Sequence, residues 1–393
     1  MIEQIRGGIT APAGFLCGAT SSGIKNPKAP RLDTALVVST EPCVAAATFT
    51  TNVVKAAPVR VSMEHLKSGK IRAIVLNSGN ANACTGEAGL ATARRMAAAA
   101  AARADLQANQ VLVCSTGRIG VPLPITRIEK GLSTIPLNRT HSRKCAEAIM
   151  TSDTFPKELA CQVETRNGAF RIGGIAKGAG MIDPNMATML CAITTDAAVS
   201  AVQLRKALRT AVEHSFNRIT IDGDMSTNDT VIALANGASG VTPPLEDLQE
   251  ALTAITQTLA RMIVKDGEGV TKFVEIEVVG ARSARGARRA AEAVANSTLT
   301  KCAWAGGDPN WGRIMDALGY SGASLQEEKT HIFYDDLAIV RHGVAADTAW
   351  SKLRAVAARK EFRITIDLGL GKFSHTVWTT DLTEAYVKFN LGE

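Results

Sequence analysis

Several kinds of residue and segment are scarce in this chain of 393 residues, and each scarcity disfavours a class of protein. Aromatic residues make up only 4%, so the chain is a poor candidate for binding single-stranded nucleic acid by stacking, despite its net charge of +7. No window reaches the roughly 18 uncharged apolar residues of a membrane-spanning helix. The N-terminal segment has no signal-peptide pattern, because Glu3 precedes Arg6 and glycine and proline follow. We therefore expect a cytoplasmic protein that binds neither membranes nor nucleic acid.

Closely spaced metal ligands and common cofactor motifs are also missing. The eight cysteines form no CxxC pair, and several lie in apolar strings such as VLVCST, so we interpret them as reduced core residues. None of the six histidines lies at metal-ligand spacing from another. The signatures GxxxxGK(S/T), HExxH and GxSxG are absent, and Gly178-x-Gly180 lacks the third glycine of a dinucleotide fingerprint. The sequence predicts neither a bound metal nor a resident cofactor.

Strand-like and helix-like stretches alternate along the chain, which is typical of an α/β or layered α+β architecture. The last two expected strands, 362–370 and 372–380, join across a glycine-containing turn and would form a hairpin. Composition shifts toward Arg and Ala near Gly280, which favours a larger layered domain over 1–280 and a smaller C-terminal α/β domain over 281–393. The other expected strands lie at 34–40, 45–54, 73–78, 110–116, 170–176, 230–237 and 274–279, and the expected helices at 87–104, 143–150, 201–215, 244–266, from 282 onward, and 350–359.

A glycine-rich loop leads into an apolar run in the middle of the chain. Residues 173–196 read GGIAKGAGMIDPNMATMLCAITTD, with Lys177 at the start of the loop and Thr188 at its exit. The glycines and the proline interrupt any helix or central strand. One interpretation is a turn that feeds a buried element, with Thr188 as a half-buried strand residue. The other interpretation is that Thr188 is a nucleophile.

The second interpretation requires a base beside the Thr188 hydroxyl. A threonine at the N-terminus of a chain supplies its own base, the α-amine, whose unperturbed pKa is roughly 7.7–8.0. Thr188 reaches that form only if the bond after Ala187 is cut. The hydroxyl would attack the Ala187 carbonyl, and the resulting ester would hydrolyse. Spacing and composition leave both interpretations open.

Eight ordered segments between residues 77 and 390 carry a resemblance to a known family. They read NSGNANACTG (77–86), CSTGRIGVPLPI (114–125), IMTSDTFPK (149–157), the segment 173–196 given above, SFNRITIDGDMSTNDT (215–230), KDGEGVTK (265–272), GGDPNWGRI (306–314) and DLTEAYVKFN (381–390). Together they resemble the glutamate N-acetyltransferase/ornithine acetyltransferase family of arginine biosynthesis, and the segment around Ala187-Thr188 resembles its self-cleavage motif.

The resemblance implies both a fold and an assembly. The chain would be cut into an α chain, 1–187, and a β chain, 188–393, that remain together. The family's fold is a layered α/β structure shared with self-cleaving L-aminopeptidases/D-esterases. Family members usually assemble as (αβ)2 heterotetramers.

The resemblance also implies a ping-pong acetyl transfer. Thr188 would take the acetyl group from N2-acetylornithine, ornithine would leave, and glutamate would accept the acetyl group. Some family members use acetyl-CoA as a second donor, a choice that the sequence leaves open. The alternative is a self-cleaving amidohydrolase or aminopeptidase of the same fold. A basic binding or scaffold protein without chemistry is disfavoured by the low aromatic content and the spread of charge.

Thr116 and Gly117 match the Thr-Gly pair that forms the oxyanion hole in the family. Acyl transfer passes through a tetrahedral oxyanion, for which the site needs preorganised donors. Both residues follow the strand-like stretch VLVC, so they are expected where backbone groups become available at the end of a strand.

The substrates carry carboxylates and amines, so their site needs charges of both signs. In the family, residues that match Thr154, Lys177 and Glu268 bind substrate together with the nucleophile, Thr188. Lys177 would pair with a carboxylate or stabilise developing charge, and Glu268 would hold an amine. Asn390 matches a C-terminal asparagine that closes the pocket.

The chain departs from the family pattern in two places. Family members usually run several residues past the matching asparagine and end with a Ser or Thr that contacts substrate, whereas this sequence ends with Leu391-Gly392-Glu393. Asp183 stands before Pro184, where an apolar residue or histidine is more usual, and adds a negative charge near the expected cut.

Overall fold

The computed structural model describes residues 1–26, 28, 31–183 and 189–391. The chain forms two compact units. The boundaries between these units differ from the boundary near Gly280 that composition suggested. Strand β11 (Phe273–Ala281) lies in the interior of the second unit's sheet, so it belongs to that unit. The first unit comprises Met1–Gly178, Asn185–Asn217 and Asp224–Ile263, and the second comprises Ala179–Pro184, Arg218–Gly223 and Val264–Glu393.

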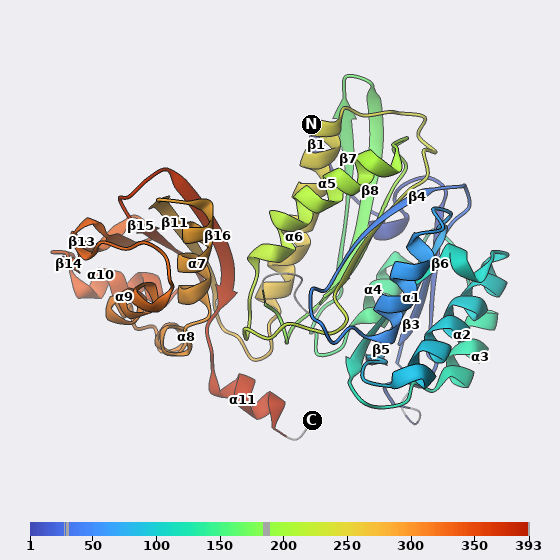
Figure 1. Cartoon of the computed structure of the whole chain (residues 1–393), viewed down its shortest axis with the longest axis horizontal. Coiled ribbons are helices and arrows are strands. Elements are labelled where there is room, and N and C mark those ends of the chain that lie inside the picture. Colours follow the sequence, from blue (N-terminus) through green and yellow to red (C-terminus); the bar gives the residue numbers. More distant parts are fainter. Residues whose placement is uncertain (27, 29–30, 184–188, 392–393) are drawn as a thin grey trace. The chain divides into compact units, whose positions relative to one another are not determined.

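Two stacked sheets form the centre of the first unit (Figure 1). Helix α4 (Ser142–Ile149) contacts both sheets and shares one apolar core with their facing sides. The six-stranded sheet has the order β1-β7-β8-β9-β10-β4, and the four-stranded sheet has the order β2-β3-β5-β6. The strands are β1 (Ile2–Ile5), β2 (Phe15–Thr20), β3 (Thr34–Ser39), β4 (Val44–Phe49), β5 (Ala73–Asn80), β6 (Val111–Arg118), β7 (Lys157–Thr165), β8 (Gly168–Lys177), β9 (Leu190–Thr195) and β10 (Thr230–Ala235).

Helices cover the outer faces of both sheets, which gives an α/β/β/α layering. On the four-stranded sheet lie α1 (Ala57–Leu66), α2 (Gly86–Ala104) and α3 (Ile125–Thr134), which share a second apolar core with β3, β5 and β6. On the six-stranded sheet lie α5 (Ala201–Glu213) and α6 (Leu245–Lys265), which Figure 1 shows in yellow-green to yellow along that sheet. The stacking places the ends of strands from two different sheets at one edge of the sandwich.

Local sequence explains where α5 begins and which face it buries. The Ser200 hydroxyl accepts a hydrogen bond from Gln203 N, and Gln203 Oε1 accepts one from Ser200 N, so the helix starts with a capping box. Leu204, Leu208 and Ala211 recur at helical spacing and are fully or almost fully buried. The same periodicity predicted this helix from sequence.

The second unit is built on one six-stranded sheet with the order β14-β13-β12-β15-β11-β16. Helix α7 packs against β11 and β16, and an apolar core joins this sheet to its helices. The remaining elements are β12 (His331–Tyr334), β13 (Leu337–Arg341), β14 (Val344–Ala345), β15 (Glu361–Asp367), β16 (Phe373–Thr380), α7 (Ala284–Ala295), α8 (Thr298–Ala305), α9 (Trp311–Tyr320), α10 (Trp350–Ala357) and α11 (Glu384–Asn390).

The expected hairpin between the last two strands is wrong. Both strands exist, but β11 lies between them, parallel to β15 and antiparallel to β16. Val274, Ile276 and Val278 on β11 are completely buried, which suits an interior position in the sheet. A glycine-containing turn between two strands does not show whether they pair with each other or with a third strand that lies between them.

Most other predicted elements are confirmed. The remaining expected strands correspond to β3, β4, β5, β6, β8, β10 and β11, and the expected helices to α2, α4, α5, α6, α7 and α10. Strand β7 has no β-branched run, and its first residue is a lysine, so sequence gave no strand signal there.

Two of the eight cysteines are not core residues. Cys84 and Cys302 are exposed, which corrects the interpretation of all the cysteines as core, whereas five others are buried. Cys84 lies at a turn with φ +55°, and Cys302 lies on the outer side of α8. Among the described residues, no helix is both long and apolar enough to cross a membrane.

Candidate active site

The ends of the parallel strands β5 and β6 form the first wall of the site. Gly79 lies opposite Gly117 in the strand register, and Ser78 lies opposite Thr116. Gly117 has φ +128°, and a Cβ built on it would lie 2.4 Å from the Gly79 carbonyl carbon. Only glycine fits this conformation and this close approach. The chain thus turns away from buried Thr116 into exposed Gly117 at the end of the strand.

Buried polar side chains brace this strand end. The Ser115 hydroxyl donates to Asn77 Oδ1 at 2.6 Å. Asn228 Nδ2 donates to the carbonyl oxygens of Ser115 at 2.9 Å and Ala81 at 2.7 Å. Since these side chains are almost completely buried and hydrogen-bonded, they hold the backbone in one geometry, as a preorganised oxyanion site requires.

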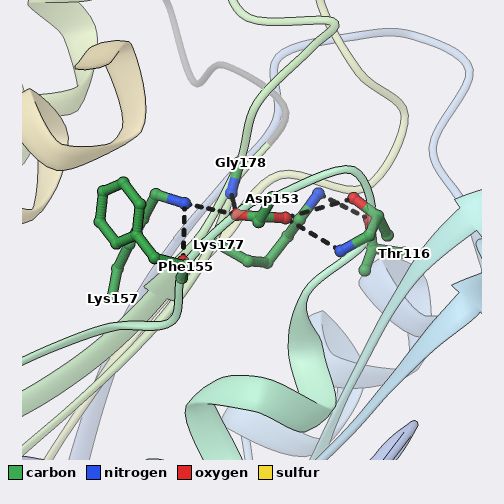
Figure 2. Close-up of polar contacts among 7 residues, drawn as sticks. Thr116, Asp153, Phe155, Lys157, Lys177 and Gly178 are labelled. Atoms are coloured by element: carbon green, nitrogen blue, oxygen red, sulfur yellow. Dashed lines mark hydrogen bonds and ion pairs between the residues drawn. The ribbon is translucent and has the colours of Figure 1, made fainter. Parts of the chain in front are cut away.

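Lys177 joins the two sheets at this edge. It is the last residue of β8 in the six-stranded sheet and is only 2% exposed. Its Nζ donates to Thr116 Oγ1 at 3.4 Å, and Thr116 lies on β6 of the other sheet (Figure 2). Two residues that are 61 positions apart in sequence, and were predicted to act on the same substrate, are therefore in contact.

A buried carboxylate, Asp153, lies beside Lys177. Its Oδ1 accepts hydrogen bonds from Lys157 Nζ at 2.7 Å and Gly178 N at 2.8 Å, and its Oδ2 accepts one from Thr151 N at 2.9 Å (Figure 2). Burial alone would raise the pKa of Asp153, but the charges of Lys177 and Lys157 and the Gly178 hydrogen bond lower it to about 2. Asp153 is therefore ionised at neutral pH and holds the backbone directly after Lys177.

Replacing Asp153 with Asn is expected to destabilise the protein by about 3–5 kcal/mol, because the buried charge of Lys157 would lose the carboxylate of its ion pair. The wild-type contribution is complete above the ordinary Asp pKa of roughly 3.9 and disappears as the pH falls through about 2, because the folded pKa is lowered. Urea unfolding at pH 7 measures the loss. The double variant Asp153→Asn/Lys157→Met removes both charges and should recover part of it; equal stability of wild type and Asp153→Asn would contradict the expectation.

The expected cleavage residues Ala187 and Thr188 lie outside the described residues. The described chain resumes at Met189, whose backbone N–H donates to Asp229 Oδ1 at 3.0 Å. Asp229 is completely buried, and burial raises its pKa well above the ordinary value, opposed by the Met189 hydrogen bond and the charge of Lys177. A buried carboxyl group thus anchors the peptide that immediately follows the proposed nucleophile.

The predicted residues Glu268 and Asn390 meet in the second unit. Asn390 Nδ2, on α11, donates to Glu268 Oε2 at 3.1 Å. Glu268 N donates to the Ala179 carbonyl at 2.9 Å, and a Cβ on Gly180 would lie 2.6 Å from the Glu268 carboxyl carbon. The glycine at position 180 therefore lets the carboxylate lie against the segment that leads toward the expected cut.

The same segment is held from a second side by Asp222. Its carboxylate accepts hydrogen bonds from Met181 N at 2.6 Å and Ile182 N at 2.8 Å. Tyr386 on α11 donates its hydroxyl to the same carboxylate at 3.3 Å. Helix α11 therefore reaches both acidic side chains, Asp222 and Glu268, of this unit.

Two further residues noted in the sequence have defined positions. Thr154 is exposed in the turn before β7, directly after Asp153. Asp183, the departure from the family pattern, accepts hydrogen bonds from Asn296 Nδ2 at 3.1 Å and Thr220 Oγ1 at 3.4 Å. Burial is the main reason that its pKa rises to about 6, so it is ionised at pH 7 and loses its charge in mildly acidic solution.

Sequence reasoning missed Asp153, Asp229 and Asn228. Each lies inside a segment that was singled out, Asp153 in SDTFPK and the other two in STNDT, but a single sequence does not show that a carboxyl group is buried. The one available signal was that the carboxylate of Asp153 stands next to Thr154, a predicted substrate residue.

A glycine-edged strand end, braced by buried amides and contacted by a buried lysine, can stabilise the oxyanion of an acyl transfer. With the layered α/β fold, it has the features that an acyl-transferring enzyme needs. The chain belongs to the ArgJ family, whose profile matches residues 16–392.

Individual relatives are similar over almost the whole chain. The arginine biosynthesis bifunctional protein ArgJ of Geobacter sulfurreducens is 50% identical, over 96% of this chain and 98% of the relative. The glutamate N-acetyltransferase of Methanocaldococcus jannaschii is 43% identical over 99% of each chain. A solved structure of the ornithine acetyltransferase of Mycobacterium tuberculosis, complexed with ornithine, is 40% identical and covers 47% of this chain and 98% of that one, with a TM-score of 0.43.

Proposed function

We propose that this enzyme of arginine biosynthesis moves an acetyl group from N2-acetylornithine to glutamate after cutting itself between Ala187 and Thr188. The observation that carries the proposal is the contact between Lys177 Nζ and Thr116 Oγ1 beside Gly117 at the end of β6. It brings a cation, a hydroxyl and a glycine-edged backbone together where an acyl oxyanion needs donors. Family membership supports the choice of substrates.

The reaction would proceed in two balanced halves. The Thr188 hydroxyl attacks the acetyl carbonyl carbon, its proton passes to the freed α-amine, and the oxyanion is held at Thr116 and Gly117. The C–N bond of the donor breaks, the α-amine returns the proton to the leaving nitrogen, and ornithine departs. The glutamate amine then attacks the acetyl ester and gives a proton to the α-amine. The bond between the acetyl carbon and the Thr188 oxygen breaks, the α-amine returns the proton to that oxygen, and N-acetylglutamate leaves with the Thr188 hydroxyl restored.

The remaining predicted residues complete the proposal. Lys177 and Thr154 would bind or orient the substrate, Glu268 would hold an amine, and Asn390 would close the pocket. The (αβ)2 assembly and the cytoplasmic location stay predictions from the sequence. Acetyl-CoA as a second donor is a separate question that the assay below includes.

The experiment is an acetyl-transfer assay on the purified protein, with mass spectrometry of its chains. We expect two chains that begin at Met1 and Thr188, and ornithine release from N2-acetylornithine that depends on glutamate and matches the N-acetylglutamate formed. Acetate release that is independent of glutamate would support the self-cleaving amidohydrolase instead. N-acetylglutamate formation from acetyl-CoA and glutamate alone would show the second activity.

A further inference from the structure

A second lysine, Lys25, lies against the end of β5, beside the proposed oxyanion site. It belongs to the loop after β2. Gly79 has φ +94°, and a Cβ built on it would lie 2.9 Å from Lys25 Cγ and 3.2 Å from Lys25 N. Gly79 itself lies opposite Gly117 in the strand register. The stem of Lys25 therefore rests on the neighbouring strand of the proposed oxyanion site, and only a glycine leaves room for it.

The loop that carries Lys25 is anchored to the sheet. The buried carboxylate of Asp33 accepts hydrogen bonds from Ser22 N at 2.7 Å and Ile24 N at 2.7 Å. The Asp33 carbonyl accepts one from Ser78 N at 3.0 Å, on the strand that ends beside Gly117. These hydrogen bonds fix the loop backbone next to Lys25 against the strand.

The printed hydrogen-bond partner of the Lys25 ammonium is an uncharged carbonyl. Its Nζ donates one hydrogen bond, to the Leu32 carbonyl at 3.1 Å, and within the described part of the chain no carboxylate forms an ion pair with it. The side chain is half-buried, and holding a charge there without a counter-ion is unfavourable. Among the described residues, the Leu32 carbonyl takes one of the three N–H groups of this ammonium, which leaves two that could bind an anion.

Four charged groups act on this ammonium. Arg31 and Lys177 oppose its charge, whereas Asp33 and Asp153 favour it. Burial is the largest influence, and the combined result lowers the pKa of Lys25 to about 8. A bound carboxylate would stabilise the charged form. Because Lys25 rests on Gly79, which lies opposite Gly117 in the strand register, an anion held by Lys25 would lie near this strand end.

We propose that Lys25 binds the side-chain carboxylate of glutamate, the acetyl acceptor. The inference rests on the proposed function. Glutamate and ornithine share an α-carboxylate and an α-nitrogen, so the same residues can hold those groups in both halves of the reaction. They differ at the other end, where glutamate has a carboxylate and ornithine an ammonium. A half-buried cation without an ionic partner, near the strand end of the proposed oxyanion site, suits the carboxylate.

The test compares Lys25→Met with Lys28→Met, which removes the same charge from an exposed position three residues further along the loop. For Lys25→Met, we expect the KM for glutamate to rise about tenfold to a hundredfold, as for loss of a hydrogen bond to a charged group. The single-turnover rate of acetylation by N2-acetylornithine should fall far less. Lys28→Met should change neither value more than about twofold. Equal losses in both halves of the reaction for Lys25→Met would overturn the proposal.

Glutamine provides a readout that does not depend on turnover, since it has the shape of glutamate without the second charge. In calorimetric titrations, wild type and Lys25→Arg should bind glutamate more tightly than glutamine, and Lys25→Met should lose that preference. A preference that persists in Lys25→Met would overturn the proposal. Wild type that keeps the preference but does not transfer acetyl would overturn the proposed function alone.

The pH dependence gives a further check. The KM for glutamate of wild type should rise as the pH passes about 8, where Lys25 loses its proton, and the KM of Lys25→Arg should not. The same rise in both proteins would assign the titration to another group and contradict the proposal.

Discussion

Thr188→Ala is expected to remain one uncut chain of 393 residues and to lose acetyl transfer entirely. The hydroxyl of this residue is proposed to act twice, first on the Ala187 carbonyl and then on the acetyl carbonyl. Alanine removes the nucleophile of both steps, and without the cut no α-amine is freed to serve as the base. The described chain resumes directly after this residue, with the Met189 N–H bonded to buried Asp229 and β9 beginning at Leu190.

Electrophoresis and intact-mass measurement would detect cleavage, and the ornithine-release assay would detect transfer. Thr188→Ser is the matched control, since it keeps a hydroxyl and should be cut and retain part of the activity. Cleavage of Thr188→Ala at the same bond would show that Thr188 is not the nucleophile of self-cleavage. Undiminished acetyl transfer by Thr188→Ala would show that Thr188 does not carry the acetyl group.

Gly117→Ala is expected to lower kcat/KM about 10²- to 10³-fold, the usual effect of losing one oxyanion donor. The glycine has φ +128°, and an added methyl group would lie 2.4 Å from the Gly79 carbonyl carbon and 2.5 Å from Asn80 N. The two strand ends would have to separate. The predicted donor would then move away from where the oxyanion forms, while most of β6 stays in its sheet.

Gly120→Ala is the control for this variant. Gly120 also has a positive φ, +78°, and lies three residues away, but a Cβ there meets nothing within 4 Å. Both variants carry backbone strain, and only Gly117→Ala carries the clash. Comparable kcat/KM values for the two, with thermal unfolding showing both folded, would exclude Gly117 from the oxyanion site.

Periodicity predicted the elements whose environment is uniform along their length. Helix α5, with its capping box and buried leucines, and strand β3, which is buried throughout, could be located from local pattern alone. Strand β7 could not, because its first residue, Lys157, is a buried charge that forms an ion pair with Asp153, and the sequence alone does not show that this lysine is buried. The predicted hairpin of β15 and β16 was wrong for a related reason. Strand order depends on contacts between distant segments, and β11 pairs with both strands.

The sequence by itself determined the family, the layered α/β class and the candidate residues, since these depend on residue types in order. It could not show that Lys177 contacts Thr116, that Asp153 ties Lys157 to the backbone after Lys177, or that Lys25 lies on Gly79. Those relations join two sheets and a loop. Only the tertiary structure decided them, because burial and charge pairing act through space between residues far apart in the chain.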